Sequence, residues 1–261
     1  MTSDIRKSNI KQMLLQKSFV SVSEMAELFT VTEETIRRDL RMLEKEGIIS
    51  RTHGGAVLKD KVSTSFERQE IRGILQASKS AMADTAKHFV QNGFCIFMDS
   101  STTVQNLFPQ IQDLQLTIVT DSIDIIIACS NLPNIKLYAL GGIYNPRTRC
   151  FSSSLGRDLL VNLYFDIAFI SCRTISSSEG LCDSSIEEAS TKRLAGQHAS
   201  KTIAMVDHTK FDRVSFAKIC GLEDIDVLIS DKPIDSSWEQ VLREKQVEVL
   251  ISRPQGSSAT V

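Results

Sequence analysis

The chain has 261 residues, of which 42% are hydrophobic and 24% are charged, and its formal net charge at pH 7 is −2. This length accommodates a small domain and a large one, each with its own core, and the charge excludes a polybasic protein that coats nucleic acid. The first residues lack the apolar stretch of a secretion signal, and no run approaches the roughly 18 apolar residues of a membrane span. We therefore expect a cytoplasmic protein with no membrane partner.

The first predicted element is a helix that begins after Ser21. Ser21 and Glu24 have the spacing of a capping box, in which each end can satisfy a free backbone N–H of the other. Met25, Leu28 and Phe29 fall on one face, which we expect to be buried.

A second helix follows at once, with Thr32 as its candidate cap. Ile36, Leu40 and Leu43 recur at helical spacing and predict a buried stripe. The opposite face and its flanks carry mostly cationic or polar side chains: Glu34, Thr35, Arg37, Arg38, Arg41 and Lys45.

Gly47 is expected to end this helix, and residues 48–56 predict a short strand, a basic turn and a return strand. In a winged helix-turn-helix, Arg51 and His53 of such a hairpin can reach phosphate or the minor groove. A helical hairpin with a solvated charged face is the alternative, but the order of cap, turn, helix stop and hairpin favours DNA binding. Because residues 1–58 contain nine basic and eight acidic residues, any grip on DNA depends on their placement.

Residues 59–77 are polar and predict a linker, and residues 78–254 alternate β-rich and helical runs. This alternation predicts an open, largely parallel α/β sheet, followed by a polar tail at 255–261. The candidate strands are Phe94–Met98, Leu116–Val119, Ile135–Leu140, Ile167–Ile170, Thr202–Val206, Val227–Ile229 and Val247–Ile251, and the candidate helices are 79–91, 103–112, 122–131, 184–200 and 235–245.

Ligands of such a sheet bind beyond the carboxyl ends of the strands. The residues at four of these ends are polar or glycine-rich: Asp99, Ser100, Ser101, Thr102 and Thr103, then Asp121, then Gly141 and Gly142, and finally Asp207 and Lys210. The Ser/Thr loop leads into a helix, so its hydroxyls and N–H groups can receive an anion.

Each of these candidates has an alternative interpretation. The loop at 99–103 can be a plain helix cap, Glu188 and Lys192 can be an i,i+4 ion pair, and Lys210 can be a surface lysine. Histidines 88, 198 and 208 have no obvious partners. The six cysteines lack the spacing of a metal site or a disulfide framework, so we expect reduced core residues and no metal or cofactor.

The run Thr35-Ile36-Arg37-Arg38-Asp39-Leu40, followed by residues 51–56, resembles the DNA-binding module of the DeoR family of bacterial transcription regulators. The resemblance implies a repressor-like protein that senses a small phosphorylated metabolite. The expected DNA-binding residues are Thr35, Arg37, Arg38, Arg41, Arg51 and His53.

The strand-end loops are similar to the effector-binding domain of the same family, whose fold is related to ribose-phosphate isomerase. The residues implied to bind the effector are Asp99, Ser100, Ser101, Thr102, Thr103, Asp121, Gly141, Gly142, Arg173, Glu188, Lys192, Asp207 and Lys210. The chain departs from the family at residues 171–174, Ser-Cys-Arg-Thr, where Gly-Ala-x-Gly is common, and at Asp121, where Asn is usual.

Two function classes remain, a ligand-gated DNA-binding regulator and a sugar-phosphate isomerase-like enzyme with an appended DNA module. An isomerase of this kind needs a carboxylate base in the loop at 171–174, which has none. Glu188 keeps the enzyme open, but we favour a regulator without catalytic residues. Its expected partners are a double-stranded DNA operator, a phosphorylated sugar, and further copies of the chain in a homodimer or homotetramer.

Overall fold

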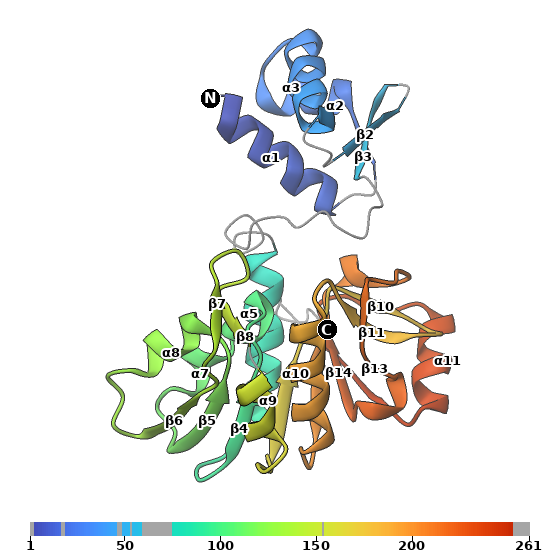
Figure 1. Cartoon of the computed structure of the whole chain (residues 1–261). Helices are drawn as coiled ribbons and strands as arrows, with labels where there is room; N and C mark the ends of the chain where they lie inside the picture. The colour runs from blue at the N-terminus through green and yellow to red at the C-terminus, as the bar shows by residue number, and fades with distance from the viewer. Residues whose placement is uncertain are drawn as a thin grey trace, which may run out of the picture. The chain divides into compact units, whose positions relative to one another are not determined.

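The structure is a computed structural model that describes residues 3–16, 19–45, 49–52, 54–58, 75–152 and 154–252. It divides into two compact units, Met1–Ile74 and Leu75–Val261 (Figure 1). Gly47, His53, residues 59–74 of the predicted linker and the predicted tail lie outside the described residues. No helix in the described ranges is both long and apolar enough to cross a membrane.

The first unit is a winged helix-turn-helix. Its helices are α1 (Ser3–Gln16), α2 (Val22–Phe29) and α3 (Glu33–Lys45), and its antiparallel sheet has the order β1 (Val20–Ser21), β3 (Gly55–Leu58), β2 (Ile49–Thr52). The predicted caps are confirmed, because Glu24 N–H donates to Ser21 Oγ at 3.1 Å and Thr35 N–H donates to Thr32 Oγ1 at 3.3 Å. Helix α1 was not predicted, since its segment is mostly polar.

The core of this unit contains the predicted stripe of α3, and Ile36, Leu40 and Leu43 are at most 1% exposed. Leu28, however, is 61% exposed, so its predicted burial is wrong. The buried positions of α2 start one turn earlier, at Val22, and Leu28 falls beside the resulting stripe. Gly55 allows β3 to approach β1, because a Cβ there would lie 2.4 Å from Val20 O.

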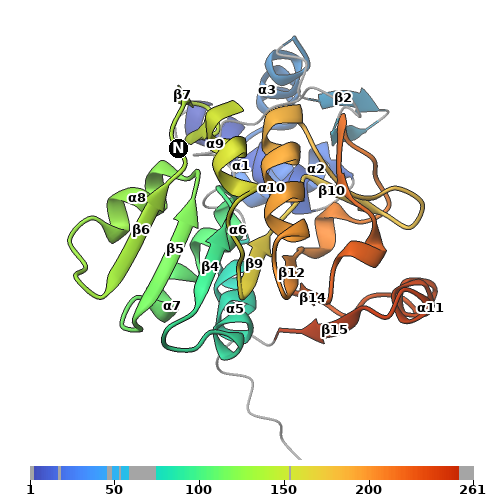
Figure 2. The same cartoon turned by 60° about the horizontal axis from the view of Figure 1, so that its bottom comes forward.

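The second unit is built on a seven-stranded parallel sheet of order β15-β14-β12-β9-β4-β5-β6, which Figure 2 shows from β6 on the left to β15 on the right. The prediction of an open parallel α/β sheet is confirmed. The strands are β4 (Cys95–Met98), β5 (Leu116–Thr120), β6 (Ile135–Ala139), β9 (Ile167–Ile170), β12 (Thr202–Met205), β14 (Val227–Ser230) and β15 (Glu248–Ile251).

Helices cover both faces of this sheet, because successive strand side chains point to opposite sides. Met98 and Phe169 pack into the cluster under one set of helices, whereas Phe97 and Ala168 pack into the cluster under the other. The first set is α5 (Gln76–Ala86), α6 (Thr102–Gln105), α7 (Phe108–Ile111) and α8 (Ile123–Cys129), and the second is α9 (Ser154–Leu160), α10 (Ile186–Gln197) and α11 (Ser236–Glu244). The single helix predicted over 103–112 is two short ones, since Pro109 has no N–H to continue it.

Short strands outside the main sheet escaped the sequence analysis, because three or four residues carry too little alternation. They form a hairpin, β7 (Ile143–Asn145) with β8 (Cys150–Ser152), and an antiparallel sheet of β10 (Thr174–Ser176), β11 (Gly180–Asp183) and β13 (Ala217–Cys220). Gly180, at φ +76°, makes this sheet possible, because a Cβ would lie 2.3 Å from Cys220 O. Three 3₁₀ turns complete the described elements: Lys87–Phe89, His208–Lys210 and Leu222–Asp224.

The strand order reverses between β4 and β9. From β4 the chain builds outward through β5 to β6, then crosses to β9 and builds in the other direction through β12 and β14 to β15. Loops at such a switch point run to opposite sides and leave a crevice beyond the carboxyl ends of the two strands. The ends of β4 and β9 are therefore where a ligand site is expected.

Candidate functional site

The exposed face of α3 presents three arginines in different states. Arg37 Nη2 lies 2.6 Å from Glu33 Oε2, and Arg41 forms an ion pair with Glu34. Arg38 is also exposed and has no hydrogen bond or ion pair within the described residues. The exposed face of α3 thus carries one arginine without a partner among the described residues and two that pair with surface glutamates.

The hairpin contributes a fourth arginine. Arg51 Nε lies 2.7 Å from Glu44 Oε2, so an ion pair links β2, the first strand of the wing, to α3. Thr35, at the start of α3, shares a 2.9 Å hydrogen bond with Thr32. His53, predicted to contact DNA, lies outside the described residues.

Asp39 has a structural role that the sequence analysis missed. It is 2% exposed, its Oδ2 lies 2.5 Å from Arg6 Nε, and its Oδ1 accepts a 3.0 Å hydrogen bond from Ser3 Oγ. These bonds fix α3 on α1. The available signal was spacing, because position 39 is three residues after Ile36 and shares its buried face, where a carboxylate requires a partner.

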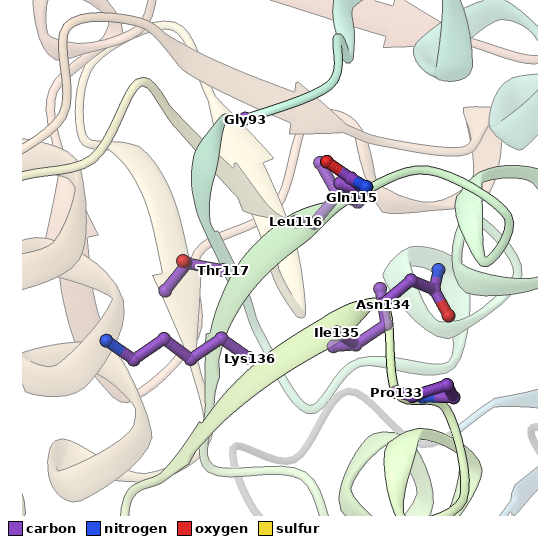
Figure 3. A pocket seen from close by; sticks show the side chains of 8 residues that line it. All are labelled: Gly93, Gln115, Leu116, Thr117, Pro133, Asn134, Ile135 and Lys136. Atoms are coloured by element: carbon purple, nitrogen blue, oxygen red, sulfur yellow. The ribbon is translucent and has the colours of Figure 1, made fainter.

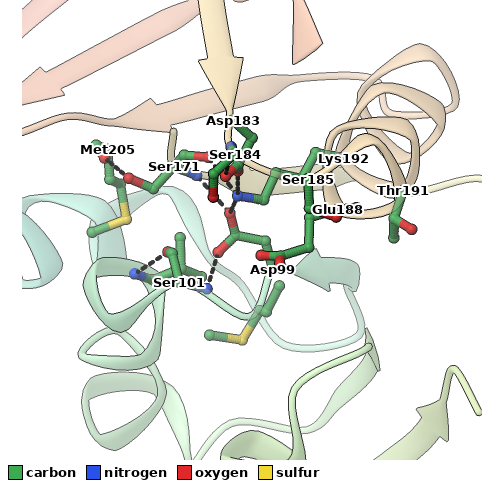
Figure 4. A network of polar contacts seen from close by, with 12 residues as sticks. Asp99, Ser101, Ser171, Asp183, Ser184, Ser185, Glu188, Thr191, Lys192 and Met205 are labelled. Carbon is green, nitrogen blue, oxygen red and sulfur yellow. Dashed lines mark hydrogen bonds and ion pairs between the residues drawn. The ribbon is translucent and has the colours of Figure 1, made fainter. Parts of the chain in front are cut away.

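At the switch point a buried network joins β4, β9 and α10 (Figure 4). Asp99 accepts N–H bonds from Ser101 at 2.8 Å and from Ser171 at 2.7 Å. Lys192 Nζ lies 3.2 Å from Asp99 Oδ2, 2.6 Å from Asp183 Oδ2 and 3.0 Å from Ser171 O. An ammonium group has three donors, so Lys192 is fully occupied and braces the crevice.

The neighbouring carboxylates keep the Lys192 ammonium group charged. Burial lowers the pKa of Lys192, but Asp183 and Asp99 outweigh it and hold that pKa well above the usual value. Glu188, four residues before Lys192, raises that pKa further by its charge, after Asp183 and Asp99, which are the ion-pair partners of Lys192.

The loop after β4 serves partly as a cap. Ser101 Oγ accepts from Val104 N–H at 3.1 Å and so starts α6, as the alternative interpretation expected. Ser100, Thr102 and Thr103 are buried at 1%, 7% and 1% exposure, so the loop is held inside the unit.

Lys210 and Asp207 extend the network across β12. Lys210 Nζ lies 2.9 Å from Ser171 Oγ and 3.5 Å from Asp207 Oδ2, and its side chain is 18% exposed, which excludes a solvated surface lysine. Burial raises the pKa of Asp207, but Lys210, two hydrogen bonds from Thr209 and the charge of Lys79 lower it below its usual value. Lys79, 3% exposed on α5, was missed by the sequence analysis, although a lysine inside an apolar helical pattern was a usable signal.

The end of β5 carries an acid, Asp121, and lies beside an unexpected thiol, that of Cys150. Phe151 N–H donates to Asp121 O at 2.9 Å, which holds the β7–β8 hairpin against the end of β5. Cys150, 2% exposed, has a pKa raised to about 12 by burial and then by the charges of Glu188 and Asp121. Residues 141–142 are exposed and lead from β6 into this hairpin.

Arg173 stands at the end of β9. Its N–H donates to Cys182 O at 2.9 Å, and its side chain is partly buried. Burial lowers the pKa of its guanidinium, Asp183 and Asp207 raise it, and Arg213 lowers it. The departure from the family pattern therefore adds a cation beside the acids of the network.

His208 has a partner, contrary to the sequence-based expectation. Its Nδ1 lies 2.8 Å from Asp231 Oδ2, its N–H donates to Asp231 Oδ1 at 2.7 Å, and its Nε2 lies 3.0 Å from Lys232 Nζ. The residues are 23 apart in sequence, but β12 and β14 are neighbours, so their carboxyl ends meet.

An open groove lies at the other, amino end of β5 and β6 (Figure 3). It contains none of the predicted site residues. Its lining consists of Gly93, Gln115, Leu116, Thr117, Pro133, Asn134, Ile135 and Lys136. Within the described residues no group of three or more His, Cys, Asp or Glu side chains could hold a metal ion, and all six cysteines are free thiols.

Family models match both units. A DeoR-like helix-turn-helix domain matches residues 6–62, and a DeoR C-terminal sensor domain matches residues 75–232.

Similar proteins span almost the whole chain. The uncharacterised HTH-type transcriptional regulator YulB of Bacillus subtilis is 35% identical over 94% of this chain and 95% of its own length. The HTH-type transcriptional regulator GolR of Listeria innocua is 33% identical over 95% of this chain and 98% of its own length. The lactose phosphotransferase system repressor of Staphylococcus epidermidis is 28% identical over 94% of this chain and 98% of its own length. Among solved structures, ribose 5-phosphate isomerase A of Methanocaldococcus jannaschii has a TM-score of 0.39 and 15% identity, over 52% of this chain and 55% of that one.

Proposed function

The chain belongs to the DeoR family of transcriptional regulators, and we propose that it is a repressor whose hold on an operator changes when a small phosphorylated sugar binds. DNA binding is assigned to residues 1–58 and effector binding to residues 78–254. As a DNA-binding regulator it acts in the cytoplasm.

The observation that carries the DNA half of the proposal is the exposed cationic face of α3. The second helix of a helix-turn-helix lies in the major groove, where an arginine can bind guanine O6 and N7. Arg38 is assigned to base reading because its guanidinium has no partner within the described residues. Thr35, Arg37, Arg41, Arg51 and His53 are assigned to phosphate and flanking contacts.

The effector half rests on the polar crevice at the strand switch point. Ser100–Thr103 and Lys210 offer hydroxyls and a cation to a phosphate, while Asp121 and Glu188 can accept hydrogen bonds from sugar hydroxyls. Asp99 and Lys192 shape the crevice through the buried network. The remaining assigned residues are Gly141, Gly142, Arg173 and Asp207.

A purely regulatory role is favoured over isomerase chemistry. The loop at residues 171–174 has no carboxylate to act as a base, and Lys192, which could assist one, has all three donors occupied. Incubation with ribose 5-phosphate should give no ribulose 5-phosphate above the uncatalysed rate.

The switch requires paired DNA modules. We assign self-association to the second unit, which would hold two modules at a fixed spacing on a two-fold symmetric operator. Effector binding then changes operator affinity by about 5- to 150-fold, the usual range of coupling between two sites.

A two-step experiment tests the proposal on the full chain. A thermal-shift screen with sugar phosphates and their unphosphorylated parents identifies an effector, which should raise Tm only when phosphorylated. Fluorescence anisotropy at one salt concentration then measures binding to operator and random DNA, with and without that compound. A protein without preference for any DNA sequence, or one whose operator affinity no sugar phosphate changes, contradicts the proposal.

A further inference from the structure

Three exposed residues of α3 share one face of the helix: Arg38, Met42 and Lys45. They are spaced by four and then three residues, so successive members lie one turn apart. Met42 is the apolar member and is 41% exposed, whereas the buried apolar residues at 36, 40 and 43 face another side of the helix. The outward face of α3 therefore carries one large apolar side chain between two cations.

An open groove lined by residues of α3 and β2 contains the same three side chains. Its lining consists of four basic residues, one acidic residue and one apolar residue: Arg38, Arg41, Lys45, Arg51, Glu44 and Met42. The acid, Glu44, already pairs with Arg51. Arg38 and Lys45 form no hydrogen bond or ion pair with any residue that the structure describes. This excess of positive charge fits a polyanion, and the polyanion would meet Met42 in the same groove.

Duplex DNA offers an apolar partner for Met42 at one kind of base. In the major groove thymine presents its C5 methyl group, and the other three standard bases present no methyl group there. A methionine side chain is unbranched and adaptable, so it can follow the position of a methyl group. The cations on either side can at the same time contact a base edge or a phosphate.

We propose that Met42 contacts the C5 methyl group of a thymine in the operator, beside the guanine that Arg38 binds, while Lys45 contacts a phosphate. This inference rests on the proposed function of α3 as the helix that reads DNA. Four residues of helix rise by about 6 Å, and successive base pairs are about 3.4 Å apart. The thymine therefore lies within about two base pairs of the guanine, on either strand.

A selection from a library of random DNA duplexes, made with the full chain at one salt concentration, gives the first test. The selected half-sites should contain a guanine and, within about two base pairs of it, a thymine. Replacing that thymine by uracil removes only the methyl group. Wild type should then bind about threefold to fivefold more weakly, which is the value of one buried methyl or methylene group. Fluorescence anisotropy measures this thymine-to-uracil ratio at each thymine of the site.

Three variants and a control assign the contact to one side chain. Met42→Ala should bind the thymine and uracil duplexes equally but still require the guanine, and Arg38→Ala should lose the guanine preference but keep the ratio. Lys45→Gln should weaken binding to both duplexes alike and make the slope of log K against log salt shallower by about one. Leu28→Ala is the matched control, because it shortens an apolar side chain that is 61% exposed on α2, and it should keep the wild-type ratio.

The inference is overturned if wild type prefers thymine over uracil at no position of the selected site, or if Met42→Ala keeps that preference. The second result is also the one expected if Met42 serves a contact with another protein. A selection that returns no consensus sequence contradicts the proposed function of α3 and the inference with it. The two failures are thus distinguished by whether a consensus exists.

Discussion

The charged residues of α3 and those of the crevice are organised in opposite ways. The side chains of Arg37 and Glu33 are 50% and 48% exposed, and each makes one contact to the other. The side chains of Lys192 and Asp99 are 4% and 0% exposed, and each has several partners. Exposed pairs contribute about 0–1 kcal/mol, whereas removing one partner of a buried pair costs about 3–5 kcal/mol.

This difference separates groups that can change partners from groups that cannot. The arginines of α3 can leave their glutamates for DNA phosphates at little cost. Lys192 would leave two buried carboxylates unpaired if it turned towards a ligand. Lys210 is intermediate, because it is more exposed and lies 3.5 Å from its carboxylate, so an effector should recruit Lys210 and leave Lys192 in place.

The largest expected effect is on the buried ion pairs of Lys192 with Asp99 and Asp183. Lys192→Met should lower the free energy of unfolding of the second unit by about 3–5 kcal/mol, because Asp99 and Asp183 stay buried without their cation. Urea unfolding followed by the fluorescence of Trp238, the only tryptophan, reports on this unit. Lys218→Met is the control, since Lys218 is half-exposed and 3.8 Å from Glu179; equal losses in both variants would contradict the comparison.

Among the described residues of the DNA-binding unit one ion pair, Arg6 with Asp39, is buried, which sharpens the comparison within a single helix. Asp39→Ala should destabilise the first unit by about 3 kcal/mol, because Arg6 keeps a buried charge. Hydrogen exchange in α1 and α3 measures the loss. The double variant Arg6→Met with Asp39→Leu should recover most of it, since both charges are removed. A double variant as unstable as Asp39→Ala would show that the ion pair is not the cause.

Arg38→Ala should leave stability nearly unchanged but reduce the preference for operator over random DNA by about 1–3 kcal/mol, if Arg38 binds one guanine. Arg37→Ala should reduce it less, because Glu33 already holds that guanidinium. Anisotropy titrations at one salt concentration measure both ratios. An unchanged ratio in Arg38→Ala would assign base reading to another residue.

The sequence predicted well those features that extend over a regular run of residues. The stripe Ile36, Leu40, Leu43 and all seven strands of the main sheet were identified because burial imposes a regular spacing or a continuous apolar run. Leu28 was misplaced because α2 has only eight residues, too few to define a face. The β7–β8 hairpin was missed for the same reason.

Partners that are distant in sequence were beyond prediction. Lys192 was named in advance but its partner Asp183 was not, because the position of Asp183 depends on the antiparallel sheet formed by unpredicted strands. Cys150 reaches the crevice only through the missed hairpin, and His208 meets Asp231 only because β12 and β14 are adjacent. Strand-end residues could be named in advance, since the ends of parallel strands meet at one edge, but their pairing required the strand order.

The smallest effect tests whether the surface pairs of α3 restrain the arginines at all. Glu33→Gln combined with Glu34→Gln frees Arg37 and Arg41 and removes two negative charges beside the DNA-binding face. The free energy of unfolding should fall by less than about 1 kcal/mol, because exposed pairs and first-turn charges are individually weak. Affinity for operator and random DNA should rise together, by about threefold to tenfold, since freed arginines bind phosphates and phosphates carry no sequence information. The slope of log K against log salt should also steepen by about one to two. Glu239→Gln combined with Glu248→Gln is the matched control, because it removes the same charge from exposed positions of the second unit. If the α3 variant and this control bind DNA equally, the glutamates do not compete with DNA for the arginines, and the two regions differ in burial alone.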